Sequence, residues 1–274
     1  MPTTTTTVTA TTGSTTATST TTTTTPEAAA ATGNISGKLL LNYFPVNAKG
    51  TAIALALDHA SLEWEGVFIK PGGTMEDLLA DWGEMKPTTP FGELPLLTIP
   101  DVGIIAHELA ILNFIGRKTA LGGKDDKEYA ASAQLMQMSE DIYAKLSKIQ
   151  PTLFDPKLDI VAAGTTAEFW NDLETGKHNF AQGLAAYLTY LETFHESCGA
   201  GPGKYTSSGV TVGECKLFAS LSYLTPIKPD CLDPYPAVKA FFGAFGALPA
   251  TKGVLETGSQ FPGPFAQYFL AHVE

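Results

Sequence analysis

The chain has 274 residues, of which 44% are hydrophobic and 16% are charged, and its formal net charge is -11 at pH 7. This composition predicts a soluble globular protein with enough apolar residues for one large core or two smaller ones. The negative charge argues against binding to nucleic-acid phosphates or anionic lipid surfaces, and no apolar run is long enough to predict a membrane-spanning helix.

Residues 1–36 form a Thr-rich tail. Seventeen of the first 25 residues are Thr, and Glu27 is the only charged residue before Lys38. Such a segment has too little apolar surface to offset the entropy of ordering it, so we expect it to be disordered. It matches neither a secretory signal nor an ordinary transit peptide. A flexible tail and an atypical organelle address remain the two alternatives.

Residues 37–119 have the pattern of an α/β domain. Short apolar runs predict strands, apolar residues at a spacing of three or four predict helices, and Gly and Pro separate them. The predicted elements are strand 38–44, helix 52–59, strand 62–69, helix 75–82, strands 94–99 and 102–105, and a closing helix through 109–115. The order βαβαββα is the thioredoxin-like plan.

Residues 125–274 are predicted to be almost wholly helical. Two sets of apolar residues step by three or four and predict long helices. The sets are Leu135, Met138, Ile142, Leu146 and Ile149, and Phe180, Leu184, Leu188, Leu191 and His195. Thr211 and Glu214 stand three residues apart before an apolar run, which predicts a capping box at the start of a further helix.

Three motifs follow one another in the α/β region: a strand that ends in Tyr43, the segment 91–97 around Pro95, and the segment 107–111. In this order they resemble the thiol-binding domain of the cytosolic glutathione transferases of the tyrosine type, and the resemblance extends over residues 38–258. It implies a thioredoxin-like N-terminal domain, an all-α C-terminal domain, and glutathione as co-substrate.

The resemblance implies a catalytic role for Tyr43, whose hydroxyl would donate to the glutathione sulfur and stabilise the thiolate, the reactive form of a thiol. It also implies a cis Pro95, with the main chain of Leu94 binding the cysteinyl part of glutathione. The structural alternatives are a tyrosine that packs in a strand and a proline that starts an edge strand.

Three further donors match the family pattern. Trp82 and Lys86, spaced i and i+4, would contact the glycyl carboxylate, because an indole N–H and an ammonium both donate hydrogen bonds. Lys49 occupies a place that is often Arg in the family. The alternative is a solvated lysine at each position and a partly buried tryptophan.

The pair His107 and Glu108 departs from the family, which usually has Gln-Ser or Glu-Ser here to hold the γ-glutamyl carboxylate at a helix start. A glutamate would set carboxylate against carboxylate, with a repulsion of roughly 4 kcal/mol at about 4 Å and an effective dielectric constant of about 20. We therefore expect either weak glutathione binding, or a Glu108 that binds the ligand's ammonium while His107 takes the carboxylate. A third alternative is that Glu108 only favours the helix dipole.

The sequence thus predicts a glutathione transferase that conjugates small apolar electrophiles in detoxification, or catalyses a related glutathione-dependent isomerisation. The alternative is a catalytically weak or inactive binding or structural relative. We expect a cytoplasmic homodimer with Phe91 at the interface. Cys198, Cys215 and Cys231 are odd in number and lack metal-ligand spacing, so we expect free thiols and no metal site.

Overall fold

The computed structural model describes residues 5–12, 15–22, 35–44, 46–68, 75–147, 183–258, 260 and 266–269. The chain separates into two compact units, residues 1–33 and residues 34–274. The division predicted near residue 119 lies within the second unit and stays a prediction.

The first unit contains a hairpin in place of the disorder expected for this segment. Strand β1 (Thr5–Thr12) pairs antiparallel with β2 (Thr15–Thr22). The expectation considered burial alone, whereas Thr is β-branched and favours extended backbone and cross-strand Thr pairs. An isolated two-stranded hairpin is only marginally stable in water, so the composition still limits how firmly this unit can fold.

The second unit contains the predicted mixed sheet, with strand order β5-β3-β6-β7. Its strands are β3 (Leu39–Tyr43), β5 (Trp64–Phe68), β6 (Leu96–Ile99) and β7 (Gly103–Ala106). β3 runs parallel to β5 and antiparallel to β6, and β6 and β7 form the predicted hairpin. This topology, with the helices described next, confirms the thioredoxin-like plan.

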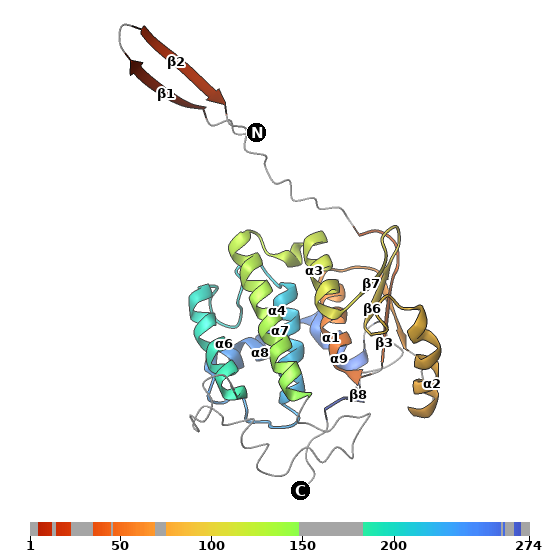
Figure 1. Cartoon of the computed structure of the whole chain (residues 1–274). Helices are drawn as coiled ribbons and strands as arrows, with labels where there is room; N and C mark the ends of the chain where they lie inside the picture. Colours follow the sequence, from red (N-terminus) through yellow and green to blue (C-terminus); the bar gives the residue numbers. More distant parts are fainter. Residues whose placement is uncertain are drawn as a thin grey trace. The chain divides into compact units, whose positions relative to one another are not determined.

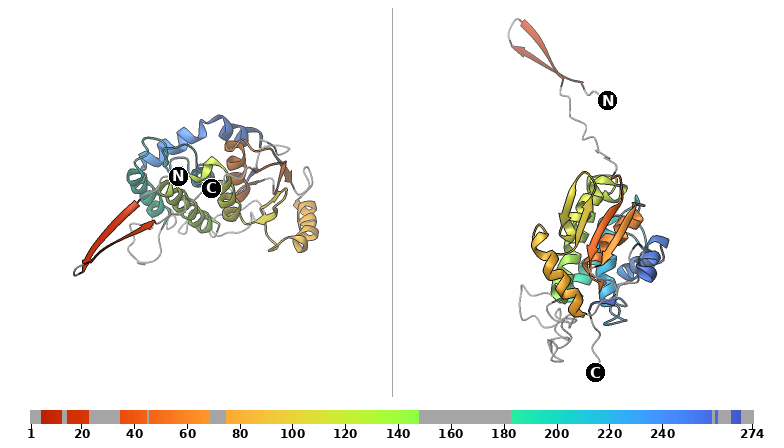
Figure 2. Two further views of the ribbon diagram at one scale, coloured as in Figure 1. Left: turned by 90° about the horizontal axis from the view of Figure 1, so that it is seen from above. Right: turned by 90° about the vertical axis from the view of Figure 1, so that its right-hand side faces the viewer.

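Three helices accompany the sheet: α1 (Lys49–His59), α2 (Met75–Met85) and α3 (Glu108–Lys118). In Figure 1, α1 and α3 lie on the side of the sheet that faces the other helices, and α2 lies on the opposite side; the right-hand view of Figure 2 shows the strands of the same sheet side by side. Two short 3₁₀ helices, η1 (Lys86–Thr88) and η2 (Ala120–Gly122), follow α2 and α3.

The rest of the unit is helical, as predicted. Its helices are α4 (Asp126–Leu146), α6 (Leu184–Cys198), α7 (Val212–Leu224), α8 (Pro236–Gly246) and α9 (Pro249–Thr257). Ile149 and Phe180 of the predicted apolar sets lie outside the described residues. Short strands β4 (Val46–Asn47) and β8 (Ala266–Gln267) pair in parallel and join the C-terminal region to the start of α1.

Helix α7 is the centre of the helical part, because all thirteen of its residues are buried. The predicted capping box is confirmed: the Thr211 side chain accepts from the N–H of Glu214, and the Glu214 carboxylate accepts from the N–H of Thr211. Gly213 allows α7 to approach α4, since a Cβ there would lie 2.2 Å from the carbonyl oxygen of Ser132. Within the described ranges, no helix is long and apolar enough to cross a membrane.

Candidate functional site

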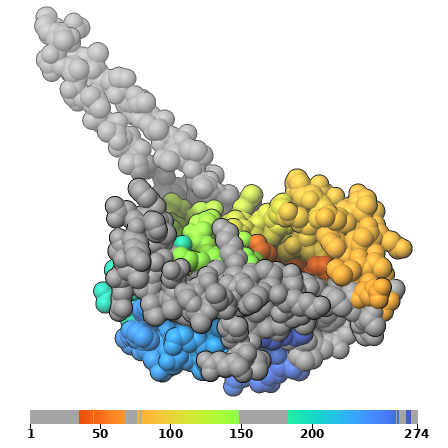
Figure 3. All heavy atoms as spheres, turned by 60° about the horizontal axis from the view of Figure 1, so that its bottom comes forward, coloured from red at the N-terminus to blue at the C-terminus, as the bar shows by residue number. Residues whose placement is uncertain are grey.

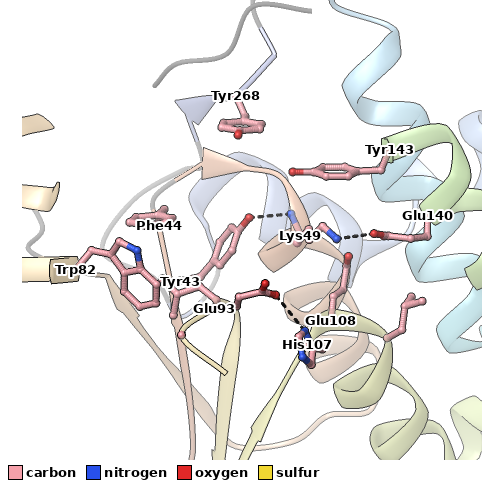
Figure 4. A pocket seen from close by; sticks show the side chains of 13 residues that line it. Tyr43, Phe44, Lys49, Trp82, Glu93, His107, Glu108, Glu140, Tyr143 and Tyr268 are labelled. Atoms are coloured by element: carbon pink, nitrogen blue, oxygen red, sulfur yellow. Dashed lines mark hydrogen bonds and ion pairs between the residues drawn. The ribbon is translucent and has the colours of Figure 1, made fainter. Parts of the chain in front are cut away.

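A pocket of about 530 Å³ lies where the end of β3 and the start of α3 meet α4. Figure 3 shows this region in orange, yellow and green, and Figure 4 shows the side chains. The lining residues are Tyr43, Phe44, Lys49, Trp82, Gly92, Glu93, Leu94, His107, Glu108, Leu109, Glu140, Tyr143 and Tyr268. Six of the eight predicted site residues are therefore brought together, and Lys86 and Pro95 stand outside the lining.

Tyr43 ends β3, and its side chain is directed into the pocket (Figure 4). Its hydroxyl oxygen accepts a hydrogen bond of 3.0 Å from the backbone N–H of Lys49, the first residue of α1. Burial, with the nearby Tyr143 and Glu108, raises the pKa of Tyr43 well above its usual value. Tyr43 is thus a neutral phenol whose oxygen already has a donor, which leaves its own O–H to donate to a ligand.

The peptide bond between Leu94 and Pro95 is cis, which confirms that prediction. Pro95 is buried just before β6, whereas Leu94 is partly exposed and lines the pocket. The bond therefore lies at the junction of the pocket wall and the central sheet.

Trp82 and Lys86 differ in position. Trp82, near the end of α2, lines the pocket and packs edge-on against Phe44, with ring centroids 6.1 Å apart. Lys86 begins η1 and is exposed, and its aliphatic carbons lie beside Gly92. Lys86 thus lies next to a pocket residue without being part of the lining.

His107 stands before α3 with a φ of 68°, a region that non-glycine residues rarely occupy. Its ring stacks on Phe91 with centroids 4.9 Å apart, and its Nδ1 lies 3.3 Å from a carboxylate oxygen of Glu93. The His107 side chain is thus held by Phe91 and by Glu93, of which Glu93 lines the pocket.

The Glu108 side chain is turned inward, which alters the repulsion expected from the sequence. Its Oε2 lies 2.6 Å from the Nζ of Lys216 on α7, and both side chains are at most 1% exposed. Burial raises the pKa of Glu108, and the charge of Lys216 opposes that rise. The carboxylate is thus compensated within the protein by Lys216, and its expected repulsion of a ligand's carboxylate stays a prediction.

Glu108 is one end of a chain of four charges that joins the sheet region to the helical region. Lys216 Nζ also lies 3.0 Å from Glu140 Oε2, and Glu140 Oε1 lies 2.5 Å from the Nζ of Lys49. Burial would raise the pKa of Glu140, but Lys216 and Lys49 hold it below its usual value. This series of ion pairs runs from the buried Lys216 to Lys49, whose side chain is 30% exposed at the pocket.

Four residues at or beside the pocket were not predicted from the sequence, and they come from four separate segments: Glu93, Glu140, Lys216 and Tyr268. A lysine between the apolar residues Cys215 and Leu217 was a usable signal for Lys216, because a buried lysine needs a partner. Phe44 and Tyr143 line the pocket, whereas the nearby apolar residues Val46 and Met136 are not among its lining and are buried in the core. Among the described residues, no cluster of three or more His, Cys, Asp or Glu could hold a metal ion.

No family model matches the chain. Among curated proteins, it is 28% identical to glutathione S-transferase A1 of Mus musculus over 227 residues, which is 82% of this chain and 91% of that protein. It is 22% identical to glutathione S-transferase P of Homo sapiens over 78% of this chain and 89% of that protein. A shorter match, 32% identical over 106 residues, covers 39% of this chain and 47% of glutathione S-transferase 1 of Ascaris suum.

Solved structures agree with this pattern. The glutathione S-transferase from Ascaris lumbricoides covers 80% of this chain and 96% of its own length, with a TM-score of 0.58 and 23% identity. The Pi-class glutathione S-transferase of Onchocerca volvulus covers 78% of this chain and 90% of its own length, with a TM-score of 0.60 and 21% identity. These likenesses show a shared fold, with the α/β part first and the helical part after it.

Proposed function

We propose that this chain is a cytosolic glutathione transferase of the tyrosine type, which joins the glutathione thiolate to small apolar electrophiles or catalyses a related isomerisation. The curated matches, which are named glutathione S-transferases, support this function over most of the chain. The observation that carries it is the hydroxyl of Tyr43, which is buried, neutral and already oriented by the N–H of Lys49 at the pocket.

The chemistry proposed for Tyr43 is thiolate stabilisation. The thiol of glutathione loses its proton to solvent, and the phenol O–H donates a hydrogen bond to the resulting sulfur anion. Such a bond to the charged form lowers the thiol pKa and raises the fraction of thiolate. The thiolate then forms a bond to the electrophilic carbon. In the same reaction the bond to the leaving group breaks or, where that carbon belongs to a strained ring, a ring bond breaks. None of these steps requires a metal ion.

The remaining predicted site residues would bind the three parts of glutathione. The Leu94 main chain, beside Pro95, would hold the cysteinyl part, and Trp82 with Lys86 would hold the glycyl carboxylate. The γ-glutamyl carboxylate would bind at the start of α3 beside His107, where the helix dipole favours an anion. We also assign Lys49 to the site, because it is a cation at the pocket beside Tyr43.

The electrophile would bind on the aromatic side of the same pocket. Phe44, Tyr143 and Tyr268 line this side, and Figure 4 shows their rings around the mouth above Tyr43. Aromatic rings of this kind provide apolar area for a small hydrophobic substrate. A lining of this kind would accept more than one small electrophile, and this supports the proposed role in detoxification.

We further propose a homodimer in the cytoplasm. Phe91 supports the dimer, because its side chain is 67% exposed although it is large and apolar. The three cysteines are free in the structure, which agrees with a reducing compartment.

Retention on immobilised glutathione, with elution by free glutathione, tests the binding function. Conjugation of a small aryl halide, followed by absorbance, tests the reaction. We expect both. Retention without conjugation would favour a binding relative, and loss of both would contradict the proposed function.

A further inference from the structure

Lys216 and Glu108 form an ion pair in the interior of the protein. Both side chains are at most 1% exposed, and they come from different helices, α7 and α3. Burial of either charge alone is costly, so each requires the other. The second oxygen of Glu108, Oε1, has no hydrogen-bond partner among the described residues although it is also buried. Lys216 is therefore the principal contact that fixes this carboxylate.

Glu108 has a competing place to which its carboxylate could turn. It is the first residue of α3, and the preceding His107 makes no side-chain hydrogen bond to cap that helix. Uncapped N–H groups in a first helical turn attract a carboxylate. The Glu108 carboxylate does not take that place in the structure, because its Oε2 lies 2.6 Å from Lys216.

We propose that Lys216 is a positioning residue that holds the Glu108 carboxylate away from the start of α3, so that a ligand's carboxylate can bind there. This inference rests on the proposed function, which assigns the γ-glutamyl carboxylate of glutathione to that helix start. The pairing of Glu108 with Lys216 then leaves the start of α3 free of a competing carboxylate, as a small neutral residue at position 108 would. Lys216 acts through Glu108 and does not contact the ligand.

The test compares wild type with Lys216→Met, Glu108→Ser and the double variant Glu108→Ser/Lys216→Met. Lys216→Met leaves Glu108 free to turn to the helix start, so we expect the dissociation constant for glutathione to weaken by about tenfold. In the double variant the competing carboxylate is absent, and we expect affinity within about threefold of wild type. Titration calorimetry measures the four values.

Steady-state kinetics distinguish positioning from a loss of folding. Positioning predicts that Lys216→Met raises KM for glutathione and leaves kcat at saturating glutathione nearly unchanged, whereas a damaged fold lowers kcat. Lys216→Arg keeps the charge and should restore most of the affinity. Lys239→Met is the matched control, because it removes the same charge from an exposed lysine that pairs with Asp233; we expect it to bind glutathione as wild type does.

If Lys216→Met does not fold, Glu108→Ser and the double variant decide the matter between them. Equal affinities in these two forms support the proposal, because they show that Lys216 affects glutathione binding only when Glu108 is present, although it also pairs with Glu140. Weaker binding in the double variant overturns it, because Lys216 would then affect glutathione binding by a route other than Glu108, such as its contact with Glu140. Normal binding by a folded Lys216→Met also overturns it but leaves the proposed function intact, whereas failure of the wild type to bind glutathione overturns both.

Discussion

Tyr43 keeps its proton because its hydroxyl is buried. Its catalytic role as a hydrogen-bond donor is therefore tested by a variant that lacks the hydroxyl. Tyr43→Phe removes the donor to the sulfur and leaves the ring in the core. We expect kcat to fall by about tenfold to a thousandfold, the scale of losing one oriented donor. Stability should fall by about 1 kcal/mol, since the N–H of Lys49 loses its acceptor. Conjugation rates and thermal unfolding measure both effects.

An exposed tyrosine provides the control for this variant. Tyr129 on α4 is 51% exposed, so Tyr129→Phe should change neither rate nor stability appreciably. Equal turnover by Tyr43→Phe and wild type would remove Tyr43 from the catalytic role.

Gly50 tests the placement of Tyr43 without removing its hydroxyl. A Cβ at Gly50 would lie 2.3 Å from Cδ1 of the Tyr43 ring, so Gly50→Ala must displace that ring. A shift of the donor by about 1 Å can lower the rate by about a hundredfold, and we expect a loss of this order in kcat. Gly243→Ala on α8 is the matched control, because among the described residues no atom beyond its chain neighbours and the backbone of its own helix lies within 4 Å of the added Cβ. Full activity in Gly50→Ala would show that the ring position is not critical.

The residues of the site divide into two groups according to how far the sequence could find them. Tyr43, Leu94 and His107 stand in short motifs at strand ends, where neighbouring residues fix their place. The packing of α4 and α7, which periodicity does not determine, brings Glu140 to the pocket and Lys216 to Glu108 behind it. The direction of the Glu108 side chain depends on Lys216, 108 residues later in the chain, and could not be read from its local motif.

At the scale of elements, Glu128 joins the first turn of α4 to the loop before α7. Its carboxylate accepts hydrogen bonds from the backbone N–H groups and the hydroxyls of Ser207 and Ser208, and from the N–H of Lys124. Burial would raise the pKa of Glu128, but these donors, beginning with Ser208 and Ser207, hold it well below its usual value. The loop is thus fastened by an ionised carboxylate.

Glu128→Gln should therefore destabilise the protein in a pH-dependent way. The loss at pH 7 should be about 1–3 kcal/mol, because charge-assisted hydrogen bonds are weakened. A depressed pKa contributes stability above the unfolded value of about 4.3, and this contribution declines as pH falls toward the folded value. The gap between wild type and variant should thus narrow below about pH 4. Urea unfolding at several pH values measures it, and a gap independent of pH would contradict the argument.

The elements themselves were largely predictable, for physical reasons that also explain the exceptions. Helical periodicity and the Thr211 capping box are local signals, and both reappear in the structure. The pairing of β4 with β8 joins residues more than two hundred positions apart through two-residue strands, which no pattern marks. In the first unit, the high β-propensity of Thr favours strands, whereas the low hydrophobicity favours disorder. The expectation of disorder rested on the low hydrophobicity alone.

At the scale of the whole molecule, the sheet and helical parts of the second unit are joined through polar contacts at the pocket. The hydroxyl of Tyr223 on α7 donates to the carbonyl of Ala48 at 2.7 Å, just before α1. The four-charge chain makes the same connection beside it, from Lys49 to Glu140 and from Lys216 to Glu108. Since the pocket lies at this junction, a change in how the two parts pack would alter the ligand site.

Phe91 carries the prediction on assembly. It is 67% exposed, and its ring stacks on His107, so an apolar anchor lies beside the proposed γ-glutamyl site. An aromatic side chain that fills a partner's pocket is typically worth about 2 kcal/mol or more, which corresponds to about 30-fold in the dimer dissociation constant. We expect wild type to have twice the 29.0 kDa mass of one chain. The Phe91→Ser dimer should be weaker and should already be dissociated at protein concentrations where wild type is still dimeric.

Light scattering over a range of micromolar concentrations measures this shift. Leu79→Ser is the control, because Leu79 is also apolar and 52% exposed but stands on α2; we expect it to leave the dimer intact. Because Phe91 packs on His107, Phe91→Ser should also raise KM for glutathione, and it should do so even at concentrations where the dimer persists. A monomeric wild type would refute the dimer, whereas a Phe91→Ser dimer as tight as wild type would place the interface elsewhere on the molecule.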